Sequence, residues 1–176
     1  MVRAFVAVGS NINAAENVEA AIRLLSERAR VLAISTVYRT RPVGRPEQPD
    51  YYNCVVEIET ETAPADFKRT VLRGIERKLG RTRGQDKFAA RTVDLDLVLY
   101  GDLVIRTKGL TLPDPEILSR PFLAAPLCEL APDLVIPGSG MAVSQVAESL
   151  PRDEMTPLLA YTEHLRREIA HGHPES

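Results

Sequence analysis

The chain has 176 residues, of which 44% are hydrophobic and 26% charged, with a formal net charge of −2 and a pI of about 6.0. This length supports one hydrophobic core, so we expect a single domain over residues 1–176. The small net charge argues against a global attraction to nucleic acid. Because the apolar runs are short, we expect neither a membrane span nor a signal peptide. We therefore expect a cytoplasmic protein that binds neither nucleic acid nor membrane, and we predict a monomer.

The N-terminal part predicts a strand, a helix and a second strand. Residues 4–10 (AFVAVGS) form a short apolar run ended by Gly and Ser, which is typical of a buried strand. Asn13 suits the N-cap of a helix, and Glu16 three residues later would complete a capping box. Apolar side chains recur at helical spacing over residues 14–29, and residues 30–40 (RVLAISTVYRT) return to the composition of a strand.

The middle of the chain predicts a loop, a strand and a second helix. Residues 41–49 contain three prolines and a glycine, which cannot continue a β-ladder. Residues 51–61 (YYNCVVEIETE) alternate two sets of side chains, as a strand does. Pro64 suits the first turn of a helix whose apolar positions extend to Leu79, and Gly80 would end that helix as a left-handed cap.

The order of the predicted elements indicates an α+β fold. The stretch RTVDLDLVLYGD adds a strand, which gives the order strand, helix, strand, strand, helix, strand. This is the split β-α-β order of a ferredoxin-like sandwich, with a mostly antiparallel sheet and helices packed on it. The last third is rich in proline and ends in a predicted helix over residues 154–170. Cys54 and Cys128 lie in apolar sequence, so we expect buried, reduced thiols.

Two aspartates, Asp94 and Asp96, interrupt the most hydrophobic predicted strand. Side chains two residues apart in a strand share a face, so these carboxylates should lie side by side and repel each other. A divalent cation relieves that repulsion, and Mg²⁺ suits one or two carboxylates with water and phosphate oxygens completing its shell. An edge strand with a wet second face explains the same pattern, and the Asp-x-Asp motif alone slightly favours that alternative.

Basic residues cluster just before these aspartates. Eight Arg or Lys residues lie between residues 69 and 91 against two acidic ones, and Arg81, Arg83 and Arg91 are the nearest to the strand. Carboxylates for metal and guanidinium groups for phosphate are the parts that phosphoryl transfer uses. A solvated helix face explains the basic cluster equally well. The sequence contains no GxxxxGK[ST] motif, which excludes a P-loop.

An aromatic–amide group follows the proline-rich loop. Tyr51 and its neighbour Tyr52 would stack on a flat heterocycle, while the amide of Asn53 would hydrogen-bond the edge of that ring. Phe122, far along the chain, would supply the opposite face. Ordinary strand aromatics are the simpler explanation of this group when it is taken alone.

Together these motifs closely resemble the 6-hydroxymethyl-7,8-dihydropterin pyrophosphokinase (HPPK) family, over about residues 4–138. The resemblance rests on VAVGSN, STVYRTRPVG, QPDYYNCVVEIET, IERKLGRTR, ARTVDLDLVLYGD and LTLPDPEILSRPFLAAPLCELAPDLVIP. Its specific part is the block RTxDLDL, with QPDYxN before it and RxF after it. The resemblance implies a ferredoxin-like fold and an enzyme of folate biosynthesis that transfers pyrophosphate from ATP to the hydroxymethyl group of the pterin, releasing AMP.

The resemblance also implies roles for individual residues. Two Mg²⁺ ions would be held by Asp94 and Asp96 and would bridge the phosphates of the co-substrate ATP. The catalytic residues it implies are Arg81, Arg91, Asp94 and Asp96. The pterin-binding residues are Thr40, Val43, Tyr51, Asn53 and Phe122. The ATP-binding residues are Glu76, Arg81, Arg83, Phe88, Arg91, Leu97, Thr111 and Arg120. The expected partners are these small molecules.

The chain departs from the family pattern in three places. Asp114 stands where the family usually has a histidine, and an anion beside a triphosphate should weaken ATP binding. Ala89 and Ala90 replace the family's Gly-Pro, and the residues after about Pro151 have no counterpart. A divergent Mg²⁺-dependent phosphoryl or nucleotidyl transferase with an altered substrate therefore stays open. A non-catalytic ferredoxin-like module for small ligands or RNA is a third hypothesis.

Overall fold

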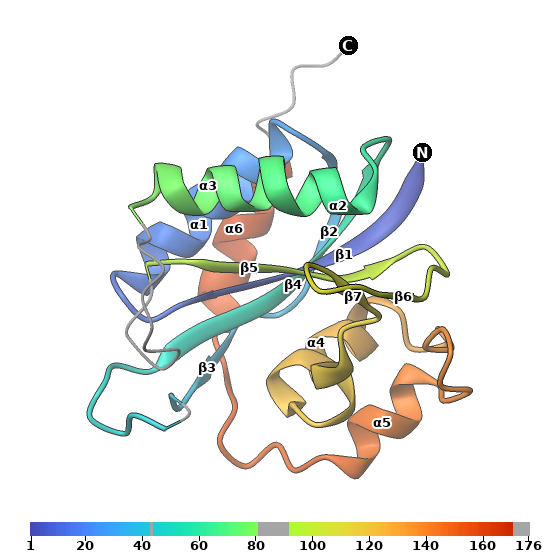
Figure 1. Ribbon diagram of the computed structural model, residues 1–176. Coiled ribbons are helices and arrows are strands. Elements are labelled where there is room, and N and C mark those ends of the chain that lie inside the picture. Colours follow the sequence, from blue (N-terminus) through green and yellow to red (C-terminus); the bar gives the residue numbers. More distant parts are fainter. Residues whose placement is uncertain (43, 81–91, 171–176) are drawn as a thin grey trace.

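Six strands form one antiparallel sheet within the residues that the structure describes, 1–42, 44–80 and 92–170 of a computed structural model (Figure 1). The strands follow the order β5-β1-β4-β3-β8, and β2 also pairs with β4. Their bounds are β1 (Val2–Ser10), β2 (Arg30–Ile34), β3 (Tyr38–Thr40), β4 (Tyr51–Thr60), β5 (Asp94–Tyr100) and β8 (Thr156–Pro157). A separate hairpin joins β6 (Ile105–Arg106) to β7 (Thr111–Leu112).

The strand order is that of the predicted ferredoxin-like fold. β1 is antiparallel to both of its neighbours, β4 and β5, and β2 is antiparallel to β4. β1 and β2 are therefore parallel to each other with β4 between them, and β4 and β5 are parallel with β1 between them. This is the split β-α-β arrangement, repeated once. The α+β prediction is confirmed.

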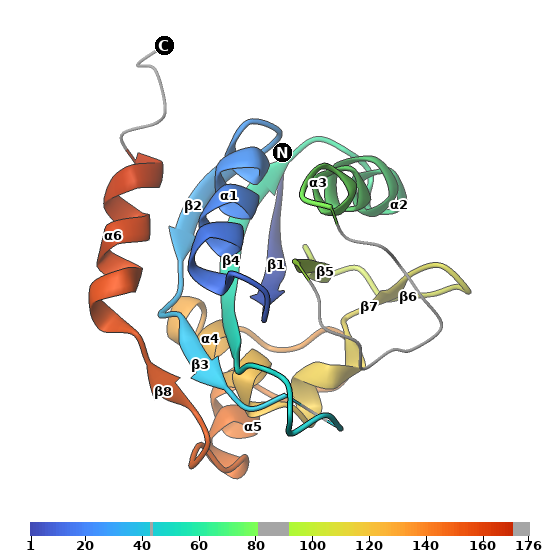
Figure 2. The same ribbon diagram turned by 90° about the vertical axis from the view of Figure 1, so that its left-hand side faces the viewer.

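Helices cover both faces of the sheet (Figures 1 and 2). One face carries α1 (Ala14–Ser26), α6 (Leu159–Ala170) and a continuous helical stretch made of α2 (Pro64–Asp66), η1 (Phe67–Leu72) and α3 (Arg73–Lys78). The other face carries α4 (Pro121–Leu130) and α5 (Val143–Ser149), preceded by the 3₁₀ turn η2 (Pro115–Leu118). No helix among the described residues combines the length and apolar character needed to cross a membrane.

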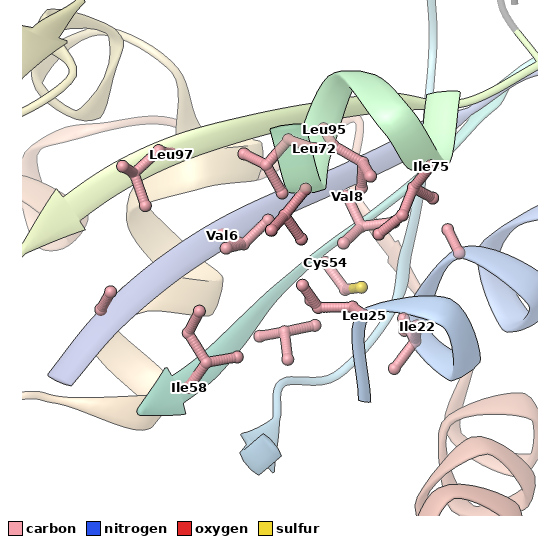
Figure 3. Packing of buried hydrophobic residues seen from close by; sticks show 14 of the residues in the cluster. Val6, Val8, Ile22, Leu25, Cys54, Ile58, Leu72, Ile75, Leu95 and Leu97 are labelled. Atoms are coloured by element: carbon pink, nitrogen blue, oxygen red, sulfur yellow. The ribbon is translucent and has the colours of Figure 1, made fainter. Parts of the chain in front are cut away.

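The sheet separates two apolar clusters. Figure 3 shows the larger one, in which Val8 and Leu95 of the sheet meet Ile22 and Leu25 of α1 and Ile75 of α3. The second cluster lies beneath α4 and α5 and includes Phe5, Val55, Val98, Leu99, Ile117, Leu123, Leu127, Ile136, Val143 and Val146. Because successive strand residues point to opposite faces, β4 and β5 contribute to both clusters. The central strands are thus fixed from both sides.

The prediction of one continuous strand over residues 30–40 is wrong, because this segment divides into β2 and β3. Ser35 lies at the break, where its backbone N–H donates to the carbonyl of Val55 and its hydroxyl accepts from the N–H of Val55 at 2.9 Å. The Ser35 side chain thus replaces a backbone carbonyl as the acceptor for Val55, and the regular pairing with β4 is interrupted there. β3 begins three residues later with its own pairing to β4.

The predicted helix bounds also need correction. The helix predicted over residues 14–29 ends at Ser26, and the one predicted over 154–170 begins at Leu159, after the short strand β8. The helix that Pro64 opens is π-helical in its middle, which its apolar spacing did not indicate. Gly80 follows that helix with φ +84°, as predicted for a left-handed cap.

The capping box predicted at the start of α1 does not form. Asn13 occupies the N-cap position, but its backbone is left-handed (φ 41°) and its side chain makes no capping hydrogen bond. A capping side chain normally reaches the helix from an extended backbone, so the left-handed conformation explains why Asn13 makes no capping hydrogen bond. Without that bond, Glu16 has no reciprocal bond to complete as a capping box. Asn tolerates the left-handed region better than most residues, which accounts for its presence here.

The two cysteines differ in burial. Cys54 is 2% exposed within the core, as predicted, whereas Cys128 is only half-buried, so the prediction of two buried thiols is wrong for Cys128. Burial, with a smaller contribution from the charge of Glu129, raises the pKa of the Cys54 thiol to about 12 from its usual 9.0. A raised thiol pKa means less thiolate at any pH below it, and the thiolate is the nucleophile.

We therefore expect selective thiol chemistry in the native protein. At pH 8, Cys128 should react with 5,5′-dithiobis-(2-nitrobenzoate), and Cys54 should react slower by a factor of about 10³ or more. In about 6 M guanidinium chloride, which unfolds most domains, both should react at similar rates. The release of nitrothiobenzoate gives both rates, and a Cys128→Ser variant isolates the slow thiol. Rapid native labelling of that variant contradicts the packing described for Cys54.

Candidate active site

One cavity of about 340 Å³ opens on the α4 side of the sheet, where β1 ends and β4 and β5 begin. It unites the two groups that the sequence indicated separately. Its lining includes Tyr51, Asn53 and Phe122 from the aromatic–amide group and the paired aspartates Asp94 and Asp96. It also includes Thr40 and Arg120, which the family resemblance implied. The strands and the start of α4 place these residues together although they are up to 82 positions apart in the chain, from Thr40 to Phe122.

The paired aspartates face this cavity because of the register of β5. Asp94 lies opposite Gly9 and Asp96 opposite Ala7 on β1, so both carboxylates project from the α4 face beside small residues. Leu95, between them, points to the other face and is fully buried. Strand alternation therefore accounts for acidic residues in an apolar strand: one face builds the core and the other builds the cavity floor.

Negative charge is concentrated in the lining of the cavity. Burial, followed by the neighbouring Asp94 charge, raises the pKa of Asp96 to about 7, although the Asp96 side chain keeps 45% of its surface open toward the cavity. The guanidinium of Arg73, with Nη2 3.9 Å from Oδ1 of Asp96, partly offsets this repulsion. Asp114 and Glu116 add further negative charge to the lining, and Arg41 and Arg120 add positive charge. The carboxylates outnumber the cations among these lining residues.

Two side chains of α3 fix the backbone between the aspartates. β5 is the edge strand, and the N–H of Leu95 donates to Oε2 of Glu76 at 3.0 Å while its carbonyl accepts from Nη1 of Arg73, also at 3.0 Å. The same Nη1 donates to Oε1 of Glu76 at 2.7 Å. Glu76 is 2% exposed and does not line the cavity. The pair thus substitutes for a neighbouring strand and holds Asp94 and Asp96 in place.

The other end of the cavity is built around the amide of Asn53. Its Nδ2 donates to the hydroxyl of Thr40 at 2.7 Å across the β3–β4 pair. Gly9 lies opposite Asn53 on β1, and a Cβ at that position would stand 2.7 Å from Oδ1 of the amide. Only glycine at position 9 leaves enough room for the Asn53 amide. Tyr51 and Phe122 line the same end.

Asp114, which replaces the expected histidine, has a structural role in this fold. Its Oδ1 accepts from the backbone N–H of Glu116 at 2.9 Å, so it caps the 3₁₀ turn η2. Its own N–H donates to the carbonyl of Val98 at 2.9 Å, which ties the turn to β5. Burial raises the pKa of Asp114. The Asp114 side chain thus lines the cavity while its Oδ1 accepts a backbone hydrogen bond.

The remaining predicted residues divide into three groups. Arg120 lines the cavity from the N-cap position of α4. Leu97 is buried in β5 and Thr111 is exposed in β7, and neither lines the cavity, so their predicted backbone contacts with adenine stay predictions. Five predicted residues lie outside the described part of the chain: Val43, Arg81, Arg83, Phe88 and Arg91.

Three residues of the site, Arg73, Arg41 and Glu116, were not predicted from the sequence. The signal for Arg73 was present, because an arginine three residues before Glu76 on a helix lies on the same face. Nothing in the sequence indicated that this face would meet the edge of β5. Arg41 and Glu116 come from a loop and a 3₁₀ turn, which carry no periodic signal.

The donor set of the cavity floor fits a hard divalent cation. Two carboxylates side by side on a supported strand are ligands that Mg²⁺ accepts, with its other positions left for water and phosphate. Within the described residues, no three His, Cys, Asp or Glu side chains are grouped as ligands for one ion. The cavity therefore has an aromatic end that suits a flat ring, a floor formed by two aspartates, and arginines at its sides.

The chain matches the family model described as 7,8-dihydro-6-hydroxymethylpterin-pyrophosphokinase (HPPK) over residues 5–132. It is 37% identical over 151 residues to the 2-amino-4-hydroxy-6-hydroxymethyldihydropteridine pyrophosphokinase of Haemophilus influenzae, a match that covers 84% of this chain and 93% of that one. The enzyme of the same name from Synechocystis sp. is 41% identical over 150 residues, with 84% and 75% covered.

A solved structure of Plasmodium falciparum HPPK-DHPS superposes with a TM-score of 0.71 at 12% identity, which shows a likeness of fold. The match covers 89% of this chain and 47% of that one, so this chain spans about half the length of the Plasmodium protein. The fold, the family model over residues 5–132 and relatives at 37% and 41% identity agree: the chain belongs to the HPPK family of pterin pyrophosphokinases.

Proposed function

We propose that this chain transfers pyrophosphate from ATP to the hydroxymethyl group of 6-hydroxymethyl-7,8-dihydropterin, a step of folate biosynthesis. The observation that carries the proposal is one cavity in which an amide and two aromatic rings lie beside two carboxylates. A flat heterocycle and a polyphosphate need these two environments next to each other. The names of the curated relatives support the same reaction.

The reaction balances as a substitution at the β-phosphorus of ATP. The hydroxymethyl oxygen forms a bond to that phosphorus, and the bond from the phosphorus to the α–β bridging oxygen breaks. AMP leaves with the bridging oxygen, and the hydroxyl proton is released to water. Positioning of the two reactants supplies much of the rate in such transfers.

At the pterin end, the Thr40–Asn53 hydrogen bond fixes which way the amide points. Thr40 accepts from Nδ2, so Oδ1 of Asn53 is the atom that faces ring N–H groups. Tyr51 and Phe122 hold the two faces of the ring, and Val43 adds a loop contact. The hydroxymethyl group then points along the cavity toward Asp94 and Asp96.

At the nucleotide end, Asp94 and Asp96 would hold Mg²⁺, and we propose two ions. When bound, the metal would neutralise phosphate charge and polarise the phosphoryl group. Arg120 binds phosphate from the α4 side, and we propose Arg81, Arg83 and Arg91 as further phosphate-binding residues. We propose Phe88 as a further nucleotide-binding residue and backbone contacts of Leu97 and Thr111 with the adenine, while Glu76 supports the site by its hydrogen bond to the backbone of β5.

A product assay tests the function directly. Purified protein with ATP, Mg²⁺ and 6-hydroxymethyl-7,8-dihydropterin should release AMP in a one-to-one ratio with the pterin diphosphate, as followed by anion-exchange chromatography. Release of ADP would instead identify a phosphoryl transferase, and release of inorganic pyrophosphate a nucleotidyl transferase. Either product overturns the proposal in favour of the divergent-transferase hypothesis. No product with any of these substrates would favour a binding module.

Replacing Gly9 with alanine should weaken pterin binding selectively. The new Cβ would stand 2.7 Å from Oδ1 of Asn53, which forces the amide away from its place. We expect the KM for the pterin to rise by about tenfold, because a displaced contact group costs both binding and alignment. Steady-state kinetics with each substrate varied in turn measure this effect.

Gly74→Ala is the matched control for that variant. Gly74 lies in α3, where an added Cβ would meet nothing within 4 Å, so alanine there should leave both KM values unchanged. An equal rise in the KM for ATP and for the pterin in Gly9→Ala would contradict the placement of Asn53 at the pterin end.

We also propose that the enzyme acts as a monomer in the cytoplasm, where ATP is supplied. Light scattering coupled to size-exclusion chromatography tests the first part, with a mass near 19.4 kDa expected.

A further inference from the structure

The C-terminal part of the chain is fastened along the outer edge of residues 34–40, the segment that leads into the pterin end of the cavity. β8 pairs with β3 antiparallel, with Thr156 opposite Arg39 and Pro157 opposite Tyr38. Figure 2 shows β8 beside β3, and α6 continuing from it alongside β2 and α1. We call residues 152–166 the C-terminal strap. It lies beyond residues 5–132, which the family model matches.

Hydrogen bonds from the strap hold several successive groups of this segment. The backbone N–H of Val37 donates to the hydroxyl of Thr162 at 2.9 Å, and the carbonyl of Val37 accepts from the N–H of Leu158 at 2.8 Å. The guanidinium of Arg166 donates twice to the carbonyl of Ile34, at 2.8 and 2.9 Å. These bonds take the place of the next strand along an edge that would otherwise face water.

The strap also grips a side chain of β3. Arg152 donates from Nη2 to the hydroxyl of Tyr38 at 3.0 Å, and its guanidinium lies 5.7 Å from the centre of the Tyr38 ring. Tyr38 is 9% exposed, so it is a buried anchor of this short strand. The contact therefore fixes β3 at a side chain as well as at its backbone.

The held segment leads directly to the cavity. Two residues after Tyr38, Thr40 is 5% exposed and accepts the hydrogen bond of the Asn53 amide at 2.7 Å. β3 has only three residues, so its position depends on its partners on both sides. One partner is β4, which carries Asn53, and the other is β8 of the strap. A shift of β3 would move the hydroxyl that orients the amide.

We propose that the C-terminal strap is a positioning element for the pterin end of the active site, with Thr162 and Arg152 as its positioning residues. This inference rests on the proposed function, because it assigns Asn53 and Thr40 to the pterin. The strap touches neither substrate and acts through β3. It should therefore govern pterin binding and leave the nucleotide end, which stands on β5 and α3 at the opposite edge of the sheet, unchanged.

The central test replaces Thr162 with valine, which keeps the side-chain shape and removes the hydroxyl. Thr162 is 1% exposed, so the Val37 N–H loses its partner in a buried place. We expect the KM for the pterin to rise by about fivefold, with the KM for ATP within about twofold of wild type. Thr162→Ser, which restores the hydroxyl, should return the pterin KM to the wild-type value. Hydrogen exchange should show faster exchange at residues 35–40 in the valine variant.

Two further variants keep the result interpretable. Tyr161→Phe removes the hydrogen bond from the same helix to the carbonyl of Ala15 on α1, so it should leave the pterin KM unchanged. Arg152→Leu removes the grip on Tyr38 from a loop residue and should raise the pterin KM even if Thr162→Val fails to fold.

Three results would overturn the inference. The first is faster exchange at residues 35–40 with both KM values unchanged, and the second is an equal rise of both KM values. The third is a pterin KM in Tyr161→Phe as high as in Thr162→Val. A wild-type protein that neither binds nor converts the pterin would overturn the proposed function itself, and the inference with it.

Discussion

Replacing Asp96 with alanine should lower the turnover of ATP and pterin by a factor of about 10³ or more, because the ligands that place the metal on the phosphates are then incomplete. Asp94→Ala should do the same, since the two carboxylates lie on one face of β5 over one cavity. AMP release at saturating ATP, pterin and Mg²⁺ measures the loss. The folded state should not suffer in Asp96→Ala, because that substitution removes one of two anions that repel each other.

Asp102→Ala is the matched control. Asp102 follows the same strand but is exposed in the turn after it, so its removal should change neither turnover nor thermal stability. Thermal unfolding without metal should give Asp96→Ala a midpoint equal to or above that of wild type. Turnover within a few-fold of wild type in either variant would show that the carboxylates do not hold the metal. A large drop in the unfolding midpoint would show that their role is structural.

Much of the fold and of the cavity could be predicted because regular patterns carry them. The alternation of β5 placed Asp94 and Asp96 on one face, and the register with β1 confirms that they share the cavity. The motif QPDYxN placed Asn53 at the start of a strand, where the structure finds it beside the same cavity. Strand and helix order sufficed for the ferredoxin-like topology because each element has its own periodicity.

The parts that escaped prediction depend on contacts between distant residues. The break between β2 and β3 comes from a Ser35 hydroxyl bonding to Val55, 20 residues away. The role of Asp114 as a cap depends on the backbone N–H of Glu116, which only a turn at Pro115 presents. The C-terminal strap carries no motif, and its partners in residues 34–40 lie more than 110 positions earlier. Such pairings have no local signature.

The support behind the aspartates leads to the second large effect. Replacing Glu76 with alanine should destabilise the protein by about 3 kcal/mol, because it leaves the buried N–H of Leu95 without its acceptor and removes the buried carboxylate that pairs with Arg73. Turnover should also fall, even where the variant is fully folded. Leu95 lies between Asp94 and Asp96 in β5, so a shift of its backbone would displace both carboxylates. Urea unfolding gives the free energy, and AMP release at a temperature below the transition gives the turnover.

A carboxylate in the same helical stretch supplies the control. Asp66 pairs with Arg69 at 2.8 Å, three residues away, as Glu76 pairs with Arg73 at 2.7 Å. The exposed Asp66 side chain keeps 58% of its surface in water, against 3% for Glu76, so Asp66→Ala should cost about 0.5 kcal/mol or less. Glu76→Gln keeps one acceptor for two donors and should fall between the two alanine variants. Equal losses for Asp66→Ala and Glu76→Ala would mean that burial does not set the strength of the Glu76 contacts, and the proposed support for β5 would fail.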